Sequence, residues 1–253
     1  MSEVTTADVA SAPVPGTGYL LVVDSDANSL VFISRLLQRL KYHICSAKTA
    51  EEAIEMATVA VPSLVITDMS LSGMNGFELI QQLKQDPRTA GIPIIIETGP
   101  LTPKLDQMCR QAGAEACIEK PVQAEELYRK VQAAIEPKPR SHIRIQTRLP
   151  VYVSNKPLDA DAGECASMLS AHGMFIRTLR PLPVRTILPV QITLSGHTVS
   201  AEAKVVYSNT FGQGAHGEPG MGLFFVDIAL RDQDLIREYI TAEVTKGIAP
   251  GRS

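Results

Sequence analysis

The sequence has little of several features that would define its class, and each absence narrows the possibilities. It holds 4 cysteines in 253 residues, and they form no CxxC pair and no zinc spacing, so reduced thiols in a cytosol are the simplest interpretation. No apolar stretch approaches the roughly 20 residues of a membrane-spanning helix. The N-terminus lacks the basic start and apolar run of a signal peptide. We therefore expect a cytoplasmic protein with no membrane insertion.

A strong excess of basic charge is also missing. Residues 1–139 carry 12 Lys and Arg against 17 Asp and Glu, whereas residues 140–253 carry 12 against 10. The second half is therefore slightly positive, which suits a small anionic ligand but not general nucleic-acid binding. The sequence has no helix-turn-helix pattern, so a DNA-binding regulator is disfavoured and we expect no DNA partner.

Strand and helix patterns alternate along the first half of the chain. The expected strands are residues 19–23, 42–47, 63–67, 92–96 and 115–119, and the expected helices are residues 28–40, 50–60, 76–84, 103–113 and 124–135. Five such units predict an α/β doubly wound domain with a five-stranded parallel sheet. Residues 1–17 precede it and have the composition of a flexible tail.

The second half changes to β-branched strands separated by Gly, Pro and Asn turns. The expected strands are residues 148–153, 172–178, 187–194, 198–208 and 220–228, and the expected helix is residues 230–244. This pattern predicts an antiparallel β-barrel with a C-terminal helix. We place the first domain at 18–136, a linker at 137–142, the second domain at 140–246 and a tail at 247–253.

Polar side chains follow four of the expected parallel strands, at the edge where functional groups gather in such sheets. They are Asp24, Asp68, Thr98 and Lys120. A carboxylate such as Asp68 can accept a phosphoryl group when a divalent cation and a lysine balance the charge. The alternative is that Asp68 caps the next helix and Lys120 is solvated.

Four spaced motifs, "LLVVDSD", "LVITDMSLSGMNGFEL", "IPIIIETG" and "GAEACIEKPV", resemble the flavodoxin-like receiver domain of two-component response regulators over residues 19–135. The resemblance implies that a histidine kinase phosphorylates Asp68. It implies Mg²⁺ held by Asp24, Asp68 and the Ser70 carbonyl. It also implies that Thr98 is the hydroxyl switch, that Lys120 pairs with the phosphate, and that the Lys120–Pro121 bond is cis.

Three positions depart from the receiver pattern. The second of two acids after the first strand is Ser25, which weakens Mg²⁺ binding. The aromatic switch three residues before the lysine is Cys117, which is too small to flip in and out of a cleft. The proline four residues after the phosphoacceptor is Ser72.

Arg140 and Arg144 stand four residues apart at the start of the second half, and Ser170 and Gly173 follow in "SMLSAHGMFIRT". Together with the ending "GEPGMGLFFVDI", they resemble the PilZ domain, a bacterial receptor for cyclic di-GMP, over residues 140–245. Arginine forks suit phosphate and guanine edges, a serine hydroxyl can hydrogen-bond either, and glycine lets backbone approach a ligand. The alternative is that both arginines are linker residues in water or paired with receiver carboxylates.

The PilZ motif is incomplete, because Met168 stands where the family has Asp or Asn. A thioether is a weak acceptor, and guanine N–H groups left unpaired would cost roughly 1–3 kcal/mol. The predicted function is that of a response regulator adaptor rather than a metabolic enzyme. It would bind cyclic di-GMP and act on an unknown output protein in motility, attachment or exopolysaccharide control. The alternative is a ligand-independent protein interaction module with two degenerate pockets.

Overall fold

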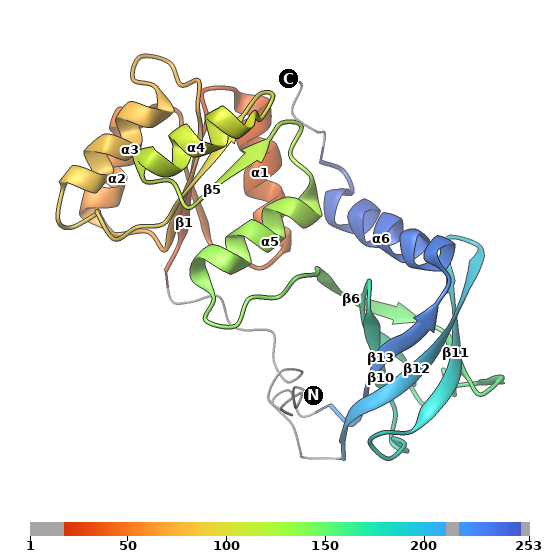
Figure 1. Cartoon of the computed structure of the whole chain (residues 1–253). Coiled ribbons are helices and arrows are strands. Elements are labelled where there is room, and N and C mark those ends of the chain that lie inside the picture. Colours follow the sequence, from red (N-terminus) through yellow and green to blue (C-terminus); the bar gives the residue numbers. More distant parts are fainter. Residues whose placement is uncertain (1–17, 211–217, 249–253) are drawn as a thin grey trace. The chain divides into compact units, whose positions relative to one another are not determined.

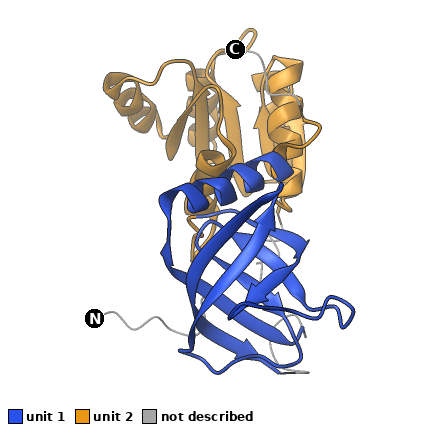
Figure 2. Ribbon diagram, turned by 90° about the vertical axis from the view of Figure 1, so that its right-hand side faces the viewer, with its two compact units in different colours: residues 1–12, 142–243 blue, residues 13–141, 244–253 orange. Residues whose placement is uncertain are grey.

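The structure is a computed structural model that describes residues 18–210 and 218–248, so the two predicted tails lie wholly or largely outside the described residues. The chain divides into two compact units (Figure 2). The first includes residues 18–141, and the second includes residues 142–210 and 218–243. No helix within the described ranges is long and apolar enough to cross a membrane.

The first unit is a five-stranded parallel sheet in the order β2-β1-β3-β4-β5 (Figure 1). Its elements are β1 (Leu20–Val23), α1 (Ala27–Arg39), β2 (Ile44–Ala47), α2 (Ala50–Val59), β3 (Leu64–Asp68), α3 (Gly76–Gln85), β4 (Ile94–Thr98), α4 (Pro103–Ala112), β5 (Ala116–Glu119) and α5 (Ala124–Ile135). The predicted fold class of this half is confirmed, and each predicted element is present within two residues at either end.

The sheet is buried on both faces, which explains why its strands are apolar runs rather than alternating sequences. On one face of the sheet, Val65, Ile94 and Ile96 pack against apolar residues of α2, α3 and α4. Neighbouring residues such as Ile66 and Ile95 are fully buried on the other face. The parallel strands therefore end together at one rim, which carries the polar side chains.

Side-chain caps begin the helices where the sequence places Asp, Thr and Asn. Asp26 caps α1, Thr49 caps α2, and Thr102 caps α4, each accepting from a backbone N–H of the first turn. Asn75 and Glu78 form a reciprocal capping box at the start of α3. These caps fix where each loop after a strand turns back into a helix.

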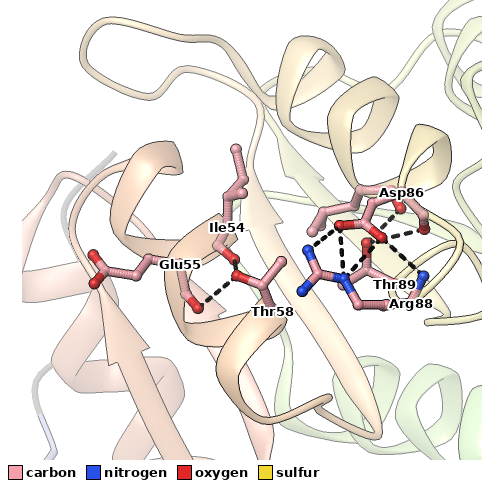
Figure 3. A network of polar contacts seen from close by, with 7 residues as sticks. Ile54, Glu55, Thr58, Asp86, Arg88 and Thr89 are labelled. Carbon is pink, nitrogen blue, oxygen red and sulfur yellow. Dashed lines mark hydrogen bonds and ion pairs between the residues drawn. The ribbon is translucent and has the colours of Figure 1, made fainter.

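Local polar contacts also hold the ends of α2 and α3 in this unit (Figure 3). The Thr58 hydroxyl donates to the carbonyl oxygens of Ile54 and Glu55 at 2.7 and 2.8 Å, within the last turn of α2. Asp86 ends α3, and its carboxylate accepts from both the backbone and the guanidinium of Arg88. These contacts shape turns that lie away from the polar rim.

The second unit is one antiparallel sheet of eight strands in the order β6-β9-β10-β13-β12-β11-β7-β8, curved into a half-barrel. Its elements are β6 (Arg144–Leu149), β7 (Val151–Val153), β8 (Lys156–Pro157), β9 (Cys165–Ser170), β10 (Gly173–Arg177), β11 (Ile187–Leu194), β12 (His197–Asn209), β13 (Gly220–Ile228) and α6 (Leu230–Thr245). The predicted antiparallel fold with a closing helix is confirmed.

The strand pattern of this unit differs from the prediction in three places, one of which is the short strand β8, which was not predicted. The predicted strand 148–153 is two strands, β6 and β7, separated at Pro150, and β6 begins already at Arg144. β9 was not predicted as a strand, and it pairs with both β6 and β10. The missing proline N–H explains the break, because proline cannot donate to a ladder.

Candidate functional site

Three charged side chains meet at the rim of the first unit. Asp24 follows β1, Asp68 ends β3, and Lys120 follows β5. The Lys120 Nζ lies 3.1 Å from Asp24 Oδ2 and 3.0 Å from Asp68 Oδ1. The sequence placed these residues after three separate strands, and the structure joins them through one ammonium group.

Burial and charge act against each other in this cluster. Burial raises the pKa of Asp24 above its ordinary value, although a hydrogen bond from the Asp26 amide and the charge of Lys120 oppose the shift. Burial also works against the Lys120 ammonium, but its contacts with Asp68 and Asp24 outweigh this, and its pKa is raised. Lys120 is therefore firmly cationic at neutral pH, as a group that pairs with phosphate must be.

Thr98 lies at the same rim, but within the described structure its hydroxyl makes no hydrogen bond with Asp68. Its hydroxyl is 3.7 Å from the Met69 sulfur, and its backbone carbonyl accepts from the Lys120 amide at 2.8 Å. Thr98 and Asp68 lie on neighbouring strands, and Asp68 pairs with Glu97, the residue before Thr98. A hydroxyl switch at Thr98 would therefore require a rotation of its side chain.

The donor set for a divalent cation consists of the Asp24 and Asp68 carboxylates and the Ser70 carbonyl. Oxygen ligands from one or two carboxylates are what Mg²⁺ takes in such sites, so these groups fit that cation. Ser25 stands where a second acid would follow Asp24, and its hydroxyl makes a long contact of 3.5 Å with the Ser70 carbonyl oxygen. That contact leaves the second lone pair of the carbonyl oxygen available to a cation.

Glu97 is a fourth ionisable residue near the cluster, and sequence reasoning missed it. It pairs in register with Asp68, is 2% exposed, and its Oε1 has no hydrogen-bond partner within the described structure. Burial raises the pKa of Glu97 to about 8, with Lys120 opposing and Asp24 and Asp68 reinforcing the shift. The signal in the sequence was an acid that interrupts the apolar run "IPIIIETG".

Cys117 occupies the place of the receiver's aromatic switch, and it is buried in the core beside α4. Burial raises the pKa of Cys117 to about 12, and its contact with the Cys109 thiol adds to the shift. Two small side chains therefore fill the space at this position. The Lys120–Pro121 peptide bond is cis, as the resemblance implied.

In the second unit, the strand register brings the motif residues into one row. Arg144 on β6 pairs with Ser170 on β9, and Ser170 pairs with Gly173 on β10. The Ser170 hydroxyl donates to the Gly173 carbonyl oxygen at 3.1 Å. A Cβ at Gly173 would collide with the Leu223 carbonyl oxygen of β13, so only glycine fits here. The row therefore combines a guanidinium, a hydroxyl and a gap without a side chain.

The next row along the sheet is aromatic, and sequence reasoning missed it. Met168 on β9 pairs with Phe175 on β10, which pairs with Gly222 on β13, which pairs with Tyr207 on β12. The rings of Phe175 and Tyr207 stack with centroids 5.9 Å apart, and a Cβ at Gly222 would collide with Tyr207. Met168 thus lies beside an aromatic pair rather than beside another polar group.

The charge of Arg144 reaches this aromatic row. Burial raises the pKa of Tyr207, and the positive charge of Arg144 opposes the shift. Arg144 belongs to the edge strand β6, whereas Tyr207 belongs to β12 on the far side of β13. The charge of Arg144 thus acts on the Tyr207 hydroxyl although the two residues belong to strands that are not neighbours in the sheet.

Arg140 belongs to the first unit, and Arg144 belongs to the second. The Arg140 amide donates to Gln132 Oε1 of α5 at 3.0 Å. Between the two arginines, the ring of His142 lies 4.1 Å from that of His172, in the turn between Ser170 and Gly173. The structure thus ties the start of β6 to that turn. Among residues 18–210 and 218–248, no group of three or more His, Cys, Asp or Glu is arranged to hold a metal ion.

Comparisons with known proteins agree with both units. The family model of the response regulator receiver domain matches residues 20–132, and that of the PilZ domain matches residues 138–242. Two-component response regulator ORR6 of Oryza sativa subsp. japonica is 29% identical over 114 residues, which are 44% of this chain and 67% of that protein.

Two bacterial relatives and one solved structure match a similar share of this chain at similar sequence identities. Sensory/regulatory protein RpfC of Xanthomonas campestris is 31% identical over 46% of this chain and 16% of its own length. Protein PilH of Pseudomonas aeruginosa is 26% identical over 46% of this chain and 96% of its own length. The chemotaxis response regulator CheY4 of Vibrio cholerae is 26% identical, with a TM-score of 0.45 over 46% of this chain and 98% of that one. The curated relatives are thus matched over 16% to 96% of their lengths.

The matches to the two family models meet between residues 132 and 138, close to the division between the two compact units. The parallel sheet carries the charged rim, and the antiparallel sheet carries the row of Arg144, Ser170 and Gly173. The chain is therefore a signalling adaptor that contains a response regulator receiver domain followed by a PilZ domain.

Proposed function

We propose that the receiver domain accepts a phosphoryl group on Asp68 from a histidine kinase. The observation that carries this proposal is the single ammonium of Lys120, which contacts both Asp24 and Asp68 at about hydrogen-bond distance. An Asp68 oxygen forms a bond to phosphorus as the bond from phosphorus to the donor nitrogen breaks, which leaves an acyl phosphate on Asp68. Lys120 then moves from the free carboxylate to the phosphoryl oxygens.

Asp24, Asp68 and the Ser70 carbonyl would hold Mg²⁺, which neutralises charge on the transferred group. The Ser25 hydroxyl brings no negative charge to this site, where a second acid would. Mg²⁺ binding should therefore be weaker than with two adjacent acids. Thr98 would hydrogen-bond the phosphoryl group after turning away from Met69.

Acetyl phosphate provides a direct test, because it can donate a phosphoryl group without the kinase. The full chain is incubated with acetyl phosphate and MgCl₂, and the intact mass is measured. We expect an adduct of one phosphoryl group in the wild type and none in Asp68→Asn. An adduct that persists in Asp68→Asn, or no adduct in either protein, would contradict the proposal.

For the PilZ domain we propose cyclic di-GMP as the ligand, bound by Arg144, Ser170 and Gly173 with Arg140 from the preceding segment. The support is the register of Arg144, Ser170 and Gly173, which puts a guanidinium, a hydroxyl and a residue without a side chain in line. Guanidinium groups hold phosphates and guanine edges with paired hydrogen bonds. Met168 offers no strong acceptor for guanine N–H groups, so we propose weakened binding.

Calorimetric titration of the full chain with cyclic di-GMP tests this assignment. We expect saturable heat in the wild type and its loss in Arg144→Ala. The output would be an unidentified protein partner that controls motility, attachment or exopolysaccharide, and this part of the proposal rests on the family alone.

A second candidate function is an interaction module that needs neither ligand. The Ser25 contact with Ser70, the thiols at Cys117 and Cys109, and Met168 beside Phe175 favour it. It predicts no heat and no thermal shift with cyclic di-GMP at about 100 µM, a concentration at which a ligand of micromolar affinity would saturate.

A further inference from the structure

Phe224 is an aromatic side chain that the fold leaves in solvent on a central strand. It lies on β13 and is 48% exposed, whereas its neighbours Leu223 and Phe225 are buried. Successive side chains of a strand point to opposite faces, so Phe224 faces outward. A phenylalanine gains nothing for stability from such a position, because burial of its ring is what would stabilise the fold.

The register aligns Phe224 with the proposed ligand residues. Phe224 pairs with Gly173 on one side and with Lys204 on the other. Gly173 pairs with Ser170, which pairs with Arg144. Directly opposed residues of antiparallel strands share a face, so one outward row contains a guanidinium, a hydroxyl, a gap, an aromatic ring and an ammonium.

Gly173 places no side chain beside Phe224, because the position of a Cβ there is taken by the Leu223 carbonyl oxygen. The Phe224 ring itself is 48% exposed and can therefore contact a ligand. Strand spacing places Phe224 roughly 10 Å from Ser170 and roughly 14 Å from Arg144.

This combination suits a ligand with both anionic and planar aromatic parts. Cations at both ends of the row match phosphates, and the open ring between them matches the face of a base. A protein partner would need no such alternation of charge and gap. A purine dinucleotide is therefore the occupant that the row fits best.

We propose that Phe224 is a base-stacking residue of the cyclic di-GMP site, with a guanine lying over Gly173 against the ring. This inference rests on the proposed function of the PilZ domain and adds a residue that lies outside the RxxxR and SxxG motifs. Stacking on Phe224 would offset part of the hydrogen bonding that Met168 cannot supply. It would also tolerate either purine, because every base presents a π-face.

The test uses the absence of tryptophan from the chain. Phe224→Trp creates a single fluorophore at the proposed contact, and Val226→Trp creates one on the same face two residues further along β13, where the side chain is also exposed. On titration of the full-length proteins with cyclic di-GMP, we expect saturable quenching for Phe224→Trp. We expect none for Val226→Trp at the same ligand concentrations.

Affinity provides the second measurement. Phe224→Ala should weaken binding roughly five- to a hundredfold, the range that loss of one stacked base produces. Phe224→Leu should also weaken it, because it keeps apolar bulk without an aromatic face, and Val226→Ala should leave it unchanged. Thermal unfolding of each variant checks that the fold is retained, which the exposure of both side chains favours.

The outcomes separate this inference from the proposed function. If the wild type binds, Arg144→Ala abolishes binding and Phe224→Ala leaves it within twofold of the wild type, the inference is wrong and the proposed function stands. Binding or quenching that survives Arg144→Ala would place the ligand outside this row and overturn both. The same holds if the wild type does not bind cyclic di-GMP.

Discussion

Glu97 is a buried acid at the rim of the receiver domain, on a strand whose other buried residues are mostly apolar. Its carboxyl is enclosed in β4 with one oxygen unpartnered, close to the charges of Asp24, Asp68 and Lys120. Buried carboxyl groups in apolar surroundings hold their proton, because the charged form loses hydration. A single proton on Glu97 therefore decides how much negative charge Lys120 must balance.

The stability of the protein should fall as pH rises from about 4.5 to about 8 because of Glu97. Its pKa is about 8 in the folded state and near the ordinary value of 4.5 in the unfolded chain. Between these values the folded state keeps a proton that the unfolded state releases, so unfolding becomes easier by up to about 1.4 kcal/mol for each pH unit. Below and above this window the contribution is constant.

Urea unfolding at several pH values measures this slope. Glu97→Gln keeps the shape of the protonated side chain and has no proton to release, so its stability should depend less on pH across the window. Asp24 also has a raised pKa, and the comparison of the two proteins removes its contribution because both retain it. Equal slopes for the wild type and Glu97→Gln would show that Glu97 is ionised in the folded protein.

Met168 allows a gain of function at the PilZ site. Met168→Asp restores an acceptor for guanine N–H groups, and binding of cyclic di-GMP should tighten roughly ten- to a hundredfold. Calorimetric titration measures the change, and Met168→Leu serves as the control because it has similar bulk and no acceptor. Weaker binding by Met168→Asp than by Met168→Leu would mean that the ligand does not approach this position.

At the scale of elements, the antiparallel sheet depends on close approach between β10 and β13. Gly173 of β10 and Gly220 of β13 supply this approach, since a Cβ at the first would meet the Leu223 carbonyl oxygen and a Cβ at the second the Ile176 carbonyl oxygen. Gly222 of β13 makes room for the ring of Tyr207 on β12.

Gly173→Ala should destabilise the protein by about 1–3 kcal/mol, the cost of forcing an extra methyl group into packed structure. The added Cβ would push against the backbone of β13, which cannot move without disturbing two ladders. Gly91→Ala is the matched control, because a Cβ there meets nothing within 4 Å. If the unfolding temperature shifts equally in both variants, the close contact of Gly173 with β13 does not constrain the protein as we predict.

The elements also show what the sequence could and could not predict. The rim was predictable because Asp24, Asp68 and Lys120 each follow an apolar run, and parallel strands end at a common edge. β9 and the start of β6 were missed because small and polar residues outnumber large apolar ones in both strands. Glu97, Tyr207 and Phe224 were missed because their roles depend on register between strands, which no local pattern reveals.

At the scale of the whole molecule, a short segment without regular structure connects the two units. Pro137, Lys138 and Pro139 are exposed there, between the end of α5 and the start of β6. Exposed segments between compact units are where proteases cut first. The connection should therefore be the most accessible tryptic site of the native chain.

Limited trypsin digestion should cut first at the Arg140–Ser141 bond, since Pro139 protects the bond after Lys138. Two fragments near the lengths of the units should accumulate, and intact mass spectrometry identifies the cut. Arg88 is the internal control, because it is exposed but lies within the first unit and is held by Asp86. Cleavage after Arg88 before Arg140 would mean that the first unit opens more readily than the connection.

The alternation along β9, β10 and β13 has a consequence for how such a protein diverges over generations. Inward side chains such as Leu169, Ile176 and Leu223 hold the sheet together, while outward ones such as Met168 and Phe224 belong to the proposed ligand surface. A single substitution outward can therefore change what the surface recognises while the fold survives selection for stability. Successive substitutions can therefore remove one ligand contact and add another while every intermediate sequence still folds.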